Sequence, residues 1–520
     1  MESLSRRMFV GGLGALIASG ALATAAGCSP QSATDMADTG TTDTVKDDIV
    51  PDSTVECDIL VIGAGASGLT AALQAAQLEA RTICLEATGD VGGNAFGIEG
   101  IFGVDSSMCK AQNLDVSAGA LIRKEMDQSQ YRCNSLALTD LVHASGENID
   151  WMLDNGILFD RVDTYVGDLP VFHYFTTGSG AESFIAPLRA AAEKAGAEFV
   201  FNAHADALAT DENGRVCGAF ATDANGVTRY DAKAVIVATG GFADNIELRS
   251  QIGYTEDTPV FGAPGRDGSG HTMCIEAGAA SNLRNACGMG GVWVDGISFA
   301  RGLSSVLNII WVNENGERFV NEDLGMENPM GGANVLAQQE RVYGLFDQAL
   351  MEEYLAADSD NFSALLAGGE VPDQHEVLQQ AIEKGIAFEA ATLADLAAQI
   401  EVDEAMLQAT VDRFNGFCAE GDDRDYGKGA PFLVPYGEGP FYAIAISNGL
   451  ATTLGSVRTD RNFSALDAEG NPIEGLYVVG VEGAMLWASL YTMNISGSAC
   501  ANNVHSGRIA AQHAAKTCLA

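Results

Sequence analysis

The chain is poor in basic residues. Its 520 residues include 28 lysines and arginines against 70 aspartates and glutamates, so the formal net charge is −42. A surface with this excess of negative charge repels phosphates, which excludes a nucleic-acid partner, and a polyanionic substrate would need a local basic pocket. The simplest interpretation of the acidity is a solvated surface that keeps the protein soluble.

Cysteine pairs that could bind a metal or a haem are also missing. The eleven cysteines are scattered, and the sequence contains neither a CxxC pair nor a CxxCH run. Zinc ribbons, clustered iron–sulfur ligation and covalent haem therefore have no support. Cys84, for example, lies in the apolar run 82–85 and is typical of a small core residue. The sequence predicts no metal site.

The length of the chain favours more than one domain. Its 520 residues exceed what a single hydrophobic core usually holds. Hydrophobic residues make up 47% and charged residues 19%, which is typical of a soluble globular protein. Many of the 60 glycines fall in short runs, where the backbone turns tightly or approaches a ligand.

Residues 1–28 are typical of a targeting segment. The run SRRMFV at residues 5–10 matches the twin-arginine export signal, and an apolar, glycine-containing stretch follows at 9–26. A single spanning helix is the alternative, but the stretch is only marginally long enough and ends in small residues. We expect export by the twin-arginine route, which carries folded proteins and suits a protein that acquires its cofactor first.

The run AAGC at residues 25–28 resembles a bacterial lipobox, which predicts a lipid anchor at Cys28. Cleavage and release without lipid is the alternative, because the motif lacks the preferred leucine. We expect a location in the cell envelope, periplasmic or on the outer face of the cytoplasmic membrane, with membrane contact only through the signal or the anchor. Residues 29–54 are rich in Ser, Thr, Asp and Ala and predict a flexible linker.

The strongest chemical signal is a strand–turn–helix–strand unit. CDILVI at 57–62 is typical of a buried parallel strand, and the turn GAGASG follows at 63–68. Helical spacing runs from 69 to 78, and a second strand at 82–85 ends at Glu86. The complete unit predicts a dinucleotide-binding fold.

Each part of this unit has a physical role to fill. Gly63 would allow the tight turn, Gly65 the close approach of a pyrophosphate, and Gly68 the packing of helix on strand. The phosphates would lie against the helix N-terminus, where free N–H groups favour negative charge. Glu86 would accept hydrogen bonds from an adenosine ribose.

Further strand-to-glycine junctions favour FAD over NAD. GGN at 92–94 follows the acidic strand, the apolar run 232–238 ends in TGGF at 239–242, and GLYVVGVE at 475–482 ends in a glycine and an acid. Ordinary turn glycines would explain any one of these junctions. The whole set, spread along the chain, favours one long ligand held at several strand ends.

At this point the sequence resembles the flavoprotein superfamily of fumarate reductases, succinate dehydrogenase flavoprotein subunits, urocanate reductase and 3-ketosteroid Δ1-dehydrogenase. The motifs that carry the resemblance are GAGASG, GGN, ATGGF, GRDGSGH, GERFVNE, GLYVVGVE and SGSACANNVHSGRIAA. The resemblance implies an α/β fold: a Rossmann-like FAD-binding domain in two parts, residues 55–260 and 430–520. An α+β capping domain, residues 261–429, would be inserted between them and would carry the substrate side of the active site.

The resemblance also implies which residues contact FAD. They are Gly63, Gly65, Ala66, Ser67, Gly68, Glu86, Gly93, Asn94, Ala95, Ala207, Gly240, Asp267, Glu482, Ala499 and Cys500. Covalent attachment in some relatives uses a histidine in the early part of the chain. No histidine occurs between residues 1 and 142, so we expect noncovalent FAD.

The chemistry implied by the resemblance is hydride transfer from flavin N5 to one carbon of an activated C=C bond, while a protein acid protonates the other carbon. The arginine that donates this proton in fumarate reductases is replaced by Met326, the substrate histidine by Thr452 and the substrate arginine by Asn494. Fumarate and succinate are therefore not expected as substrates. Arg318 and Glu322, in GERFVNE, are expected to brace the cap.

Four residues remain as candidates for catalysis. Tyr491 lies near the position of a functional tyrosine in the steroid dehydrogenases, and a phenol can donate a proton or polarise a carbonyl. His173 and Tyr174 form an aromatic cluster before a glycine turn, and Arg301 could be a displaced relay arginine. For each the alternative is structural: aromatic packing for Tyr491, His173 and Tyr174, and a surface salt bridge for Arg301.

These observations favour an exported FAD-dependent reductase of an α,β-unsaturated carbonyl or an aromatic, acrylate-like acceptor. The alternatives are a dehydrogenase that runs in the oxidising direction, as in ketosteroid desaturation, and an FAD electron-transfer lipoprotein without catalysis. Because the sequence has no haem motif, no iron–sulfur spacing and no second dinucleotide fingerprint, we expect an external electron donor, a cytochrome or another redox protein of the membrane or cell surface.

Overall fold

The computed structural model describes residues 49–165, 168–177, 179–297, 299–358, 371–492 and 495–519. The targeting segment, Cys28 and most of the expected linker lie outside the described residues, and so does Asn494. The chain from Ile49 onward forms one compact unit. Among the described residues, no helix has the length and apolarity needed to cross a membrane.

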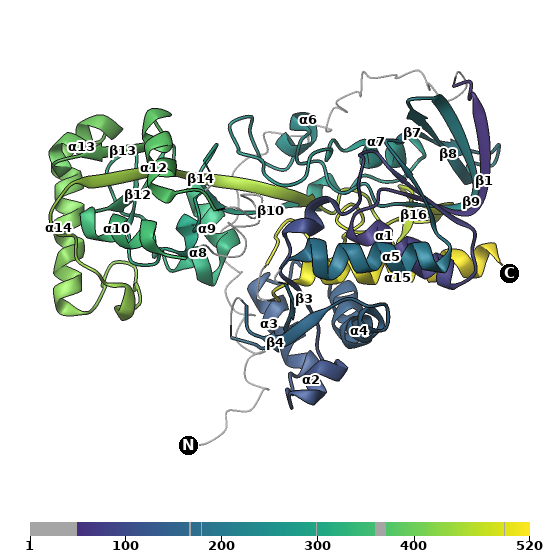
Figure 1. The fold of residues 1–520 in the computed structure, drawn as a ribbon, viewed down its shortest axis with the longest axis horizontal. Helices are drawn as coiled ribbons and strands as arrows, with labels where there is room; N and C mark the ends of the chain where they lie inside the picture. The colour runs from purple at the N-terminus through teal and green to yellow at the C-terminus, as the bar shows by residue number, and fades with distance from the viewer. Residues whose placement is uncertain are drawn as a thin grey trace, which may run out of the picture. The chain divides into compact units, whose positions relative to one another are not determined.

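A mainly parallel sheet forms the nucleotide-binding part (Figure 1). Its central strands run parallel in the order β16, β9, β1, β2 and β6, β15 pairs antiparallel with β16, and the β7–β8 hairpin continues from β9. The strands are β1 (Ser53–Ile62), β2 (Thr82–Glu86), β6 (Glu198–Phe201), β7 (His204–Thr210), β8 (Val216–Asp223), β9 (Gly226–Val237), β15 (Ser464–Leu466) and β16 (Pro472–Val478).

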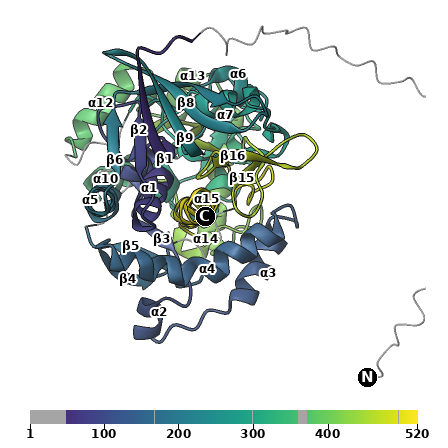
Figure 2. The same ribbon diagram turned by 90° about the vertical axis from the view of Figure 1, so that its right-hand side faces the viewer.

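Both faces of this sheet are buried. Ile59 and Val61 of β1 belong to the core shared with the helices, whereas Leu60 and Ile62 belong to the core on the opposite face. Figure 2 looks along the helices α1 (Ala66–Gln77), α5 (Ala186–Ala195) and α15 (Ser498–Cys518), which lie side by side against one face. The continuous apolar run at 59–62 is thus explained by burial on both sides.

The predicted strand, helix and second strand correspond to β1, α1 and β2. The third glycine of the turn lies in the first turn of α1, and the helix ends at Gln77, one residue before the predicted end. The parallel sheet and its helices confirm the predicted α/β fold, and the remaining elements supply the inserted α+β part.

The inserted part is built on an antiparallel sheet with its own hydrophobic core. Its strands are β10 (Cys287–Trp293), β11 (Trp311–Asn313), β12 (Val342–Phe346), β13 (Ala387–Ala390) and β14 (Phe441–Leu454). Its helices are α8 (Leu324–Glu327), α9 (Pro329–Leu336), α10 (Gln348–Ala356), α12 (Gln374–Glu383), α13 (Leu393–Ile400) and α14 (Glu404–Glu420).

One strand belongs to both parts of the molecule. The first half of β14, residues 441–446, pairs with β12 and β13 in the cap, and its second half, residues 447–454, pairs with β10. Figure 1 shows β14 as a single arrow that runs from the cap helices to the nucleotide-binding part. The cap sheet therefore extends past residue 429, where the sequence placed the end of the capping domain.

A small antiparallel sheet packs below α15 together with three helices (Figure 2). Its strands are β3 (Gly100–Phe102), β4 (Phe159–Asp163) and β5 (Phe172–Phe175), and the helices are α2 (Ser107–Ala111), α3 (Ala118–Gln128) and α4 (Ser135–Asp154). Two short helices, α6 (Ile246–Ser250) and α7 (Ser269–Glu276), precede β10.

Candidate active site

The three glycines of the first turn have different surroundings. A Cβ on Gly63 would lie 2.5 Å from the Ala238 carbonyl oxygen, and a Cβ on Gly68 would lie 1.8 Å from the Gly63 carbonyl oxygen. A Cβ on Gly65 would meet no atom closer than 4.0 Å. The outer two glycines are thus required by the protein's own packing, whereas the middle glycine faces open space where a ligand phosphate can approach the backbone.

Two other predicted contact glycines also face open space. A Cβ on Gly93 or on Gly240 would likewise have its nearest neighbour at 4.0 Å. The backbone next to Gly93 is held firmly, because the Asn94 amide donates to the Ala451 carbonyl at 3.0 Å and accepts from the Ala263 N–H at 2.7 Å. Gly93 and Gly240 need to be glycine because their φ angles are 50° and 91°. Gly65, with φ −73°, is required neither by its backbone nor by a close neighbour. The open surroundings of these three glycines are called the glycine cradle below.

Two helices whose first turns hold predicted contact residues begin without a side-chain cap. The N-terminal residues are Gly65 before α1 and Gly497 before α15, and neither helix start receives a hydrogen bond from a capping side chain. The predicted contact residues Ala66 and Ser67 lie in the first turn of α1, and Ala499 and Cys500 lie in the first turn of α15. Uncapped N–H groups at helix starts suit a phosphate or a flavin carbonyl oxygen.

The two predicted acidic contacts differ in exposure. One carboxylate oxygen of Glu86 accepts from the Ala64 N–H and the other from the N–H and hydroxyl of Thr88. Glu482 is fully buried and accepts from the hydroxyls of Thr239 and Ser456. Burial raises the pKa of Glu482 to about 7. Glu86 Oε1 already accepts two hydrogen bonds, whereas Glu86 Oε2 and the two oxygens of Glu482 each accept one and keep a lone pair for a ligand hydroxyl group.

The three remaining predicted cofactor residues have different surroundings. Ala95 is buried, and its N–H donates to the Gly92 carbonyl. Asp267 accepts from the Ser269 N–H at the start of α7. Ala207 is packed against Phe220 on the β7–β8 hairpin, and no described contact joins Ala207 to the other predicted cofactor residues, so its contact with FAD stays a prediction.

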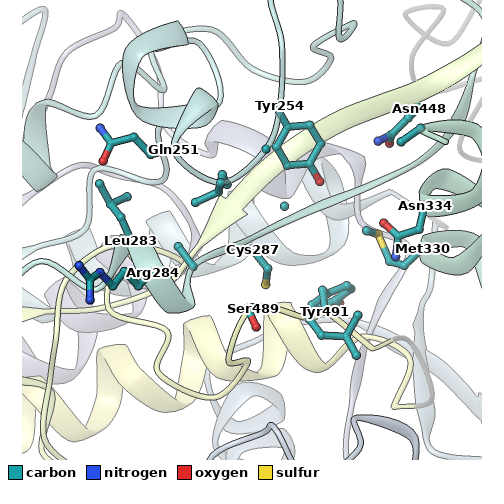
Figure 3. A pocket seen from close by; sticks show the side chains of 16 residues that line it. Gln251, Tyr254, Leu283, Arg284, Cys287, Met330, Asn334, Asn448, Ser489 and Tyr491 are labelled. Atoms are coloured by element: carbon teal, nitrogen blue, oxygen red, sulfur yellow. The ribbon is translucent and has the colours of Figure 1, made fainter. Parts of the chain in front are cut away.

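A cavity of about 350 Å³ lies between residues of α9, β10 and β14 and the loop at 489–491 (Figure 3). Tyr491, Tyr254, Cys287, Met330 and Asn448 line it together with other side chains. The cap supplies Met330 and Asn448, while Tyr491 lies seven residues before the start of α15. Among the described residues that line the cavity, Arg284 is the one charged residue, and it is exposed.

Tyr491 is the predicted candidate that the structure places in this cavity. Its ring meets Trp487 edge-on, with centroids 5.0 Å apart at 61°. Burial raises the pKa of the Tyr491 phenol well above its usual value, and the nearby Ser498 hydroxyl and Ala499 N–H counteract only part of the rise. The phenol is therefore neutral, carries a proton at physiological pH, and lies beside the first turn of α15.

Residues that the sequence did not single out also line the cavity. A Cβ on Gly288 would lie 2.1 Å from the Tyr254 hydroxyl, so that glycine leaves room for the phenol. Burial raises the pKa of Tyr254 to about 12. The amide oxygen of Asn448 is buried and makes no hydrogen bond to any described residue. These three residues lie far apart in sequence, and no local pattern indicated that they would meet.

The other catalytic candidates are not brought to the cavity. His173 is fully buried, and its Nε2 lies 2.8 Å from the Ser106 hydroxyl inside the small sheet. Burial lowers the pKa of His173 to about 4, so the ring is neutral. Tyr174 donates to the Thr164 carbonyl at 2.9 Å. Arg301 donates to the Ser305 carbonyl at 2.8 Å, and no ion pair joins it to an acid among the described residues.

The structure describes two of the positions at which the proton-donating and substrate-binding residues of fumarate reductases are replaced. Met326 lies on α8 with 40% of its surface exposed, and Thr452 is buried on β14 opposite Met289. The expected brace is present as a buried ion cluster: Arg318 contacts Glu322 and Asp423 at 2.8 Å, and the Lys428 ammonium contacts Glu322 at 3.1 Å. Among the described residues no group of His, Cys, Asp and Glu side chains is arranged to bind a metal.

The chain is similar in sequence to known flavoproteins. Residues 58–486 match the family model of the FAD binding domain. The chain is 30% identical to vinyl phenol reductase of Lactiplantibacillus plantarum over 479 residues, which cover 88% of this chain and 96% of that protein. It is 26% identical to urocanate reductase of Eggerthella lenta over 451 residues, covering 82% of this chain and 70% of that protein.

The fold also matches a solved structure. The crystal structure of 3-ketosteroid Δ1-dehydrogenase from Sterolibacterium denitrificans superposes with a TM-score of 0.74 and 19% identity, covering 89% of this chain and 100% of that one. The fold and the cradle define an FAD-dependent oxidoreductase that acts on CH–CH groups. The chain belongs to the FAD-binding family that contains the flavoproteins of fumarate reductase and succinate dehydrogenase.

Proposed function

We propose that the protein is an exported reductase that transfers hydride from noncovalently bound FAD to an activated C=C bond of a neutral or aromatic small molecule, and that fumarate is not its substrate. The observation that carries the proposal is the neutral Tyr491 phenol, which lines a 350 Å³ cavity beside the first turn of α15. The 30% identity to vinyl phenol reductase over nearly the whole of that protein supports an aryl alkene.

Different residues of the chain bind FAD, donate the proton and orient the substrate. Bound FAD, held by the glycine cradle and the starts of α1 and α15, supplies the hydride. Tyr491 donates its hydroxyl proton to the second alkene carbon, because a phenol with a raised pKa holds its proton until a strongly basic carbon develops beside it. Tyr254 and the free amide oxygen of Asn448 orient the polar end of the substrate.

The lining of the cavity supports a substrate without two carboxylates. Its phenol, amide, thiol and thioether groups are all uncharged at neutral pH, since burial raises the pKa of the Cys287 thiol to about 12. Arg284 alone could meet an anionic group, at the exposed end. A fumarate dianion would have to bury at least one carboxylate without a cation, which costs several kcal/mol.

The direct test follows the flavin itself. Chemically reduced protein is kept free of oxygen while 4-vinylphenol, a cinnamate, an enone and fumarate are added in turn, and the visible flavin spectrum is recorded. Rapid return of the oxidised spectrum with an aryl alkene or enone, and none with fumarate, is the expected result. Oxidation by fumarate at a comparable rate, or by no member of the panel, would refute the proposal.

Replacement of two tyrosines identifies the acid. Tyr491→Phe should lower kcat by about 10²- to 10⁴-fold, the usual contribution of a general acid, while the FAD content stays unchanged. Tyr254→Phe removes a phenol from the same cavity and is the matched control, with a change mainly in KM. If both variants kept the wild-type kcat, Tyr491 would not be the proton donor.

The direction of the reaction has one alternative with support. The fold shared with ketosteroid dehydrogenases and a 30% identity over 57% of this chain to 4-oxocyclohexanecarboxylate 2-dehydrogenase of Sinomonas cyclohexanicum favour a desaturase. Oxidised protein incubated without oxygen with a saturated cyclic ketone distinguishes the two, because a desaturase bleaches its flavin, or reduces an artificial acceptor when one is added, and a reductase does neither.

The state of the cofactor and the donor are further parts of the proposal. The first histidine of the chain is His143, and it lies on α4 rather than in the cradle, which supports noncovalent FAD. Acid precipitation should therefore release the flavin completely.

An external donor is proposed because two relatives are cytochrome-type fumarate reductases. Reduced viologen should support turnover and NADH should not.

The proposed location in the cell envelope rests on the leader sequence. Arg6→Lys with Arg7→Lys should retain the protein in the cytoplasm of a bacterial host with a twin-arginine system. Cys28→Ala should abolish incorporation of labelled fatty acid without blocking export. Normal export of the double lysine variant would contradict the twin-arginine route, and unchanged labelling of Cys28→Ala would contradict the anchor.

A further inference from the structure

Three polar side chains of the cavity have no partner within the described parts of the chain. The Asn448 amide, the Asn334 amide and the Tyr254 hydroxyl line the cavity, and no hydrogen bond joins any of them to a described residue. The Oδ1 atom of Asn448 is in addition buried. Leaving such groups unpaired costs free energy, so they are normally paired with protein, water or a ligand. These three residues are called the Asn448 polar cluster below.

The two amides of the cluster are held by regular elements. Met330, Asn334 and Ala337 follow one another at intervals of four and three residues, so α9 and the residue after it turn one face to the cavity. The Met330 sulfur accepts from the Gly290 N–H at 3.0 Å, which joins α9 to β10. Asn448 lies in the part of β14 that pairs with β10. Both amides therefore project from elements that are fixed to the same strand.

The Tyr254 hydroxyl reaches this strand from another segment. Tyr254 follows α6, and a Cβ on Gly288 of β10 would lie 2.1 Å from the Tyr254 hydroxyl oxygen. The phenol therefore packs directly on the backbone of β10. It keeps its proton at neutral pH and can donate it in a hydrogen bond.

A hydroxyl group on the ligand matches the cluster. The buried Oδ1 atom of Asn448 can only accept, so the ligand must bring a donor. The amide N–H groups and the Tyr254 O–H donate, so the same ligand group should also accept. A hydroxyl does both, whereas a carbonyl or ether oxygen only accepts and an ammonium only donates. An ammonium would also lack a counter-ion, because no acid is among the described residues that line the cavity.

The rest of the cavity suits the flat apolar body of an aromatic ring. Ile252, Leu283 and Leu490 line it together with the thioether of Met330. Apolar side chains with a few placed polar groups are typical of pockets for small molecules, in which the polar groups fix the orientation.

The polar ends of the cavity lie apart. Figure 3 shows Asn334 and Asn448 on one side and Arg284 on the opposite side, with Cys287 and Tyr491 between them. A ring whose hydroxyl is bound at Asn448 therefore extends into the part of the cavity that holds Tyr491. An alkene substituent on that ring would meet the proton donor of the proposed reaction.

We propose that the substrate is a hydroxyaryl alkene and that Asn448, together with Asn334 and Tyr254, binds its phenolic hydroxyl group. The proposal rests on the function proposed above and narrows its substrate class. Asn448 contributes most to this selectivity, because its buried oxygen stays unpaired when the ligand has no donor.

The first test compares alkenes that differ only at the para position of the ring. Reduced viologen drives turnover of 4-vinylphenol, 4-methoxystyrene and styrene by the FAD-loaded enzyme. The methoxy group keeps an oxygen on the ring but has no O–H to donate. The kcat/KM for 4-vinylphenol should exceed that for 4-methoxystyrene and styrene by about tenfold or more. Equal values for the three alkenes would overturn the inference.

Replacement of Asn448 tests which residue carries the preference. Asn448→Leu should lower kcat/KM for 4-vinylphenol by about tenfold or more and affect 4-methoxystyrene far less, whereas Asn448→Asp keeps an acceptor and should keep most of the preference. Asn308→Leu is the matched control, since Asn308 lies outside the cavity and its amide donates to Glu353 at 3.5 Å. The control should keep the wild-type preference. An equal loss for both alkenes in Asn448→Leu would indicate a general structural effect and contradict the proposal.

A binding measurement does not depend on turnover. The oxidised holoenzyme is titrated in a calorimeter with 4-ethylphenol and with 4-ethylanisole, neither of which has an alkene to reduce. The Kd of the wild type should be about tenfold lower for 4-ethylphenol, and Asn448→Leu should bind the two with similar Kd. A wild type that binds both equally would refute the assignment of the hydroxyl site.

Failure of the inference and failure of the proposed function remain distinguishable. If no alkene oxidises the reduced wild-type enzyme, the function is wrong, and the calorimetric comparison still reports whether the cluster binds a hydroxyl group. If an enone without a hydroxyl group is reduced well and 4-ethylphenol is not preferred over 4-ethylanisole, the function stands and only the hydroxyl site is wrong.

Discussion

Replacing the buried carboxyl of Glu125, on α3, by an amide should change how stability depends on pH. Glu125→Gln keeps the shape of the side chain but removes its titration. In the folded protein burial raises the pKa of Glu125 from an ordinary 4.5 to about 8. Between these values the folded state holds a proton that the unfolded state has lost, so the wild type becomes less stable as the pH rises.

The size of the effect follows from the shift. A difference of about 3.5 pH units at 1.36 kcal/mol per unit corresponds to about 5 kcal/mol over the whole window. About 3 kcal/mol of this loss of stability occurs between about pH 5.5 and pH 8, the range in which an acidic protein is easier to handle. The stabilisation is complete below about pH 4.5 and is lost as the pH passes about 8.

The assay is urea unfolding of the wild type and Glu125→Gln with excess FAD at several pH values from about 5.5 to 9. The difference between the free energies of unfolding should move steadily in favour of the variant up to about pH 8 and then level off. Glu482, whose pKa is raised to about 7, titrates in the same range in both proteins and cancels in the difference. A constant difference at every pH would refute the assignment of Glu125 as a buried neutral acid.

Two further sets of variants test the cradle and the cap. Gly65→Ala should keep the fold but lose FAD, measured as flavin content, because its Cβ would occupy the open space left for the ligand. Gly68→Ala should lower the melting temperature, because its Cβ would lie 1.8 Å from a backbone oxygen. Gly291→Ala, whose Cβ would have no neighbour within 4 Å, should change neither flavin content nor melting temperature. Lys428→Met should lower the free energy of unfolding by about 3–5 kcal/mol because it removes the ammonium beside the buried Asp323 and leaves the charge of Glu322 to Arg318. Lys384→Met, which removes a bond to a surface carbonyl, should cost less than about 0.5 kcal/mol; similar losses in both lysine variants would contradict the role of the buried cluster.

The nucleotide-binding unit could be predicted from the sequence because its signals are local. A strand, a tight turn and a helix start within about 20 residues each impose their own residue types, and the structure places β1, the turn and α1 where the pattern indicated. The separate roles of Gly63, Gly65 and Gly68 also followed from the motif, since each glycine is required by a different neighbour.

The cavity could not be predicted in the same way because its residues meet only through tertiary packing. Tyr254, Cys287 and Asn448 come from separate segments, and none carries a motif. His173 was a reasonable candidate from its aromatic neighbours, but alternation along β5 turns its ring toward Ser106 in the core. One signal was present for Glu125: it lies four residues after the buried Leu121, which puts a carboxyl on the apolar face of α3.

The strand β14 has a mechanical consequence for substrate entry. Both chain crossings between cap and cradle, β10 and β14, are hydrogen-bonded to each other as a two-stranded ribbon, with a register irregularity between Met289 and Gly290. A cap joined to the nucleotide-binding part by flexible loops would rotate freely. This cap is joined by the paired strands β10 and β14, so its rotation requires the two strands to twist together. The Ala451 carbonyl, near the end of β14, accepts a hydrogen bond from the Asn94 amide. A rotation of the cap is therefore transmitted through β14 to the residue next to Gly93 in the glycine cradle.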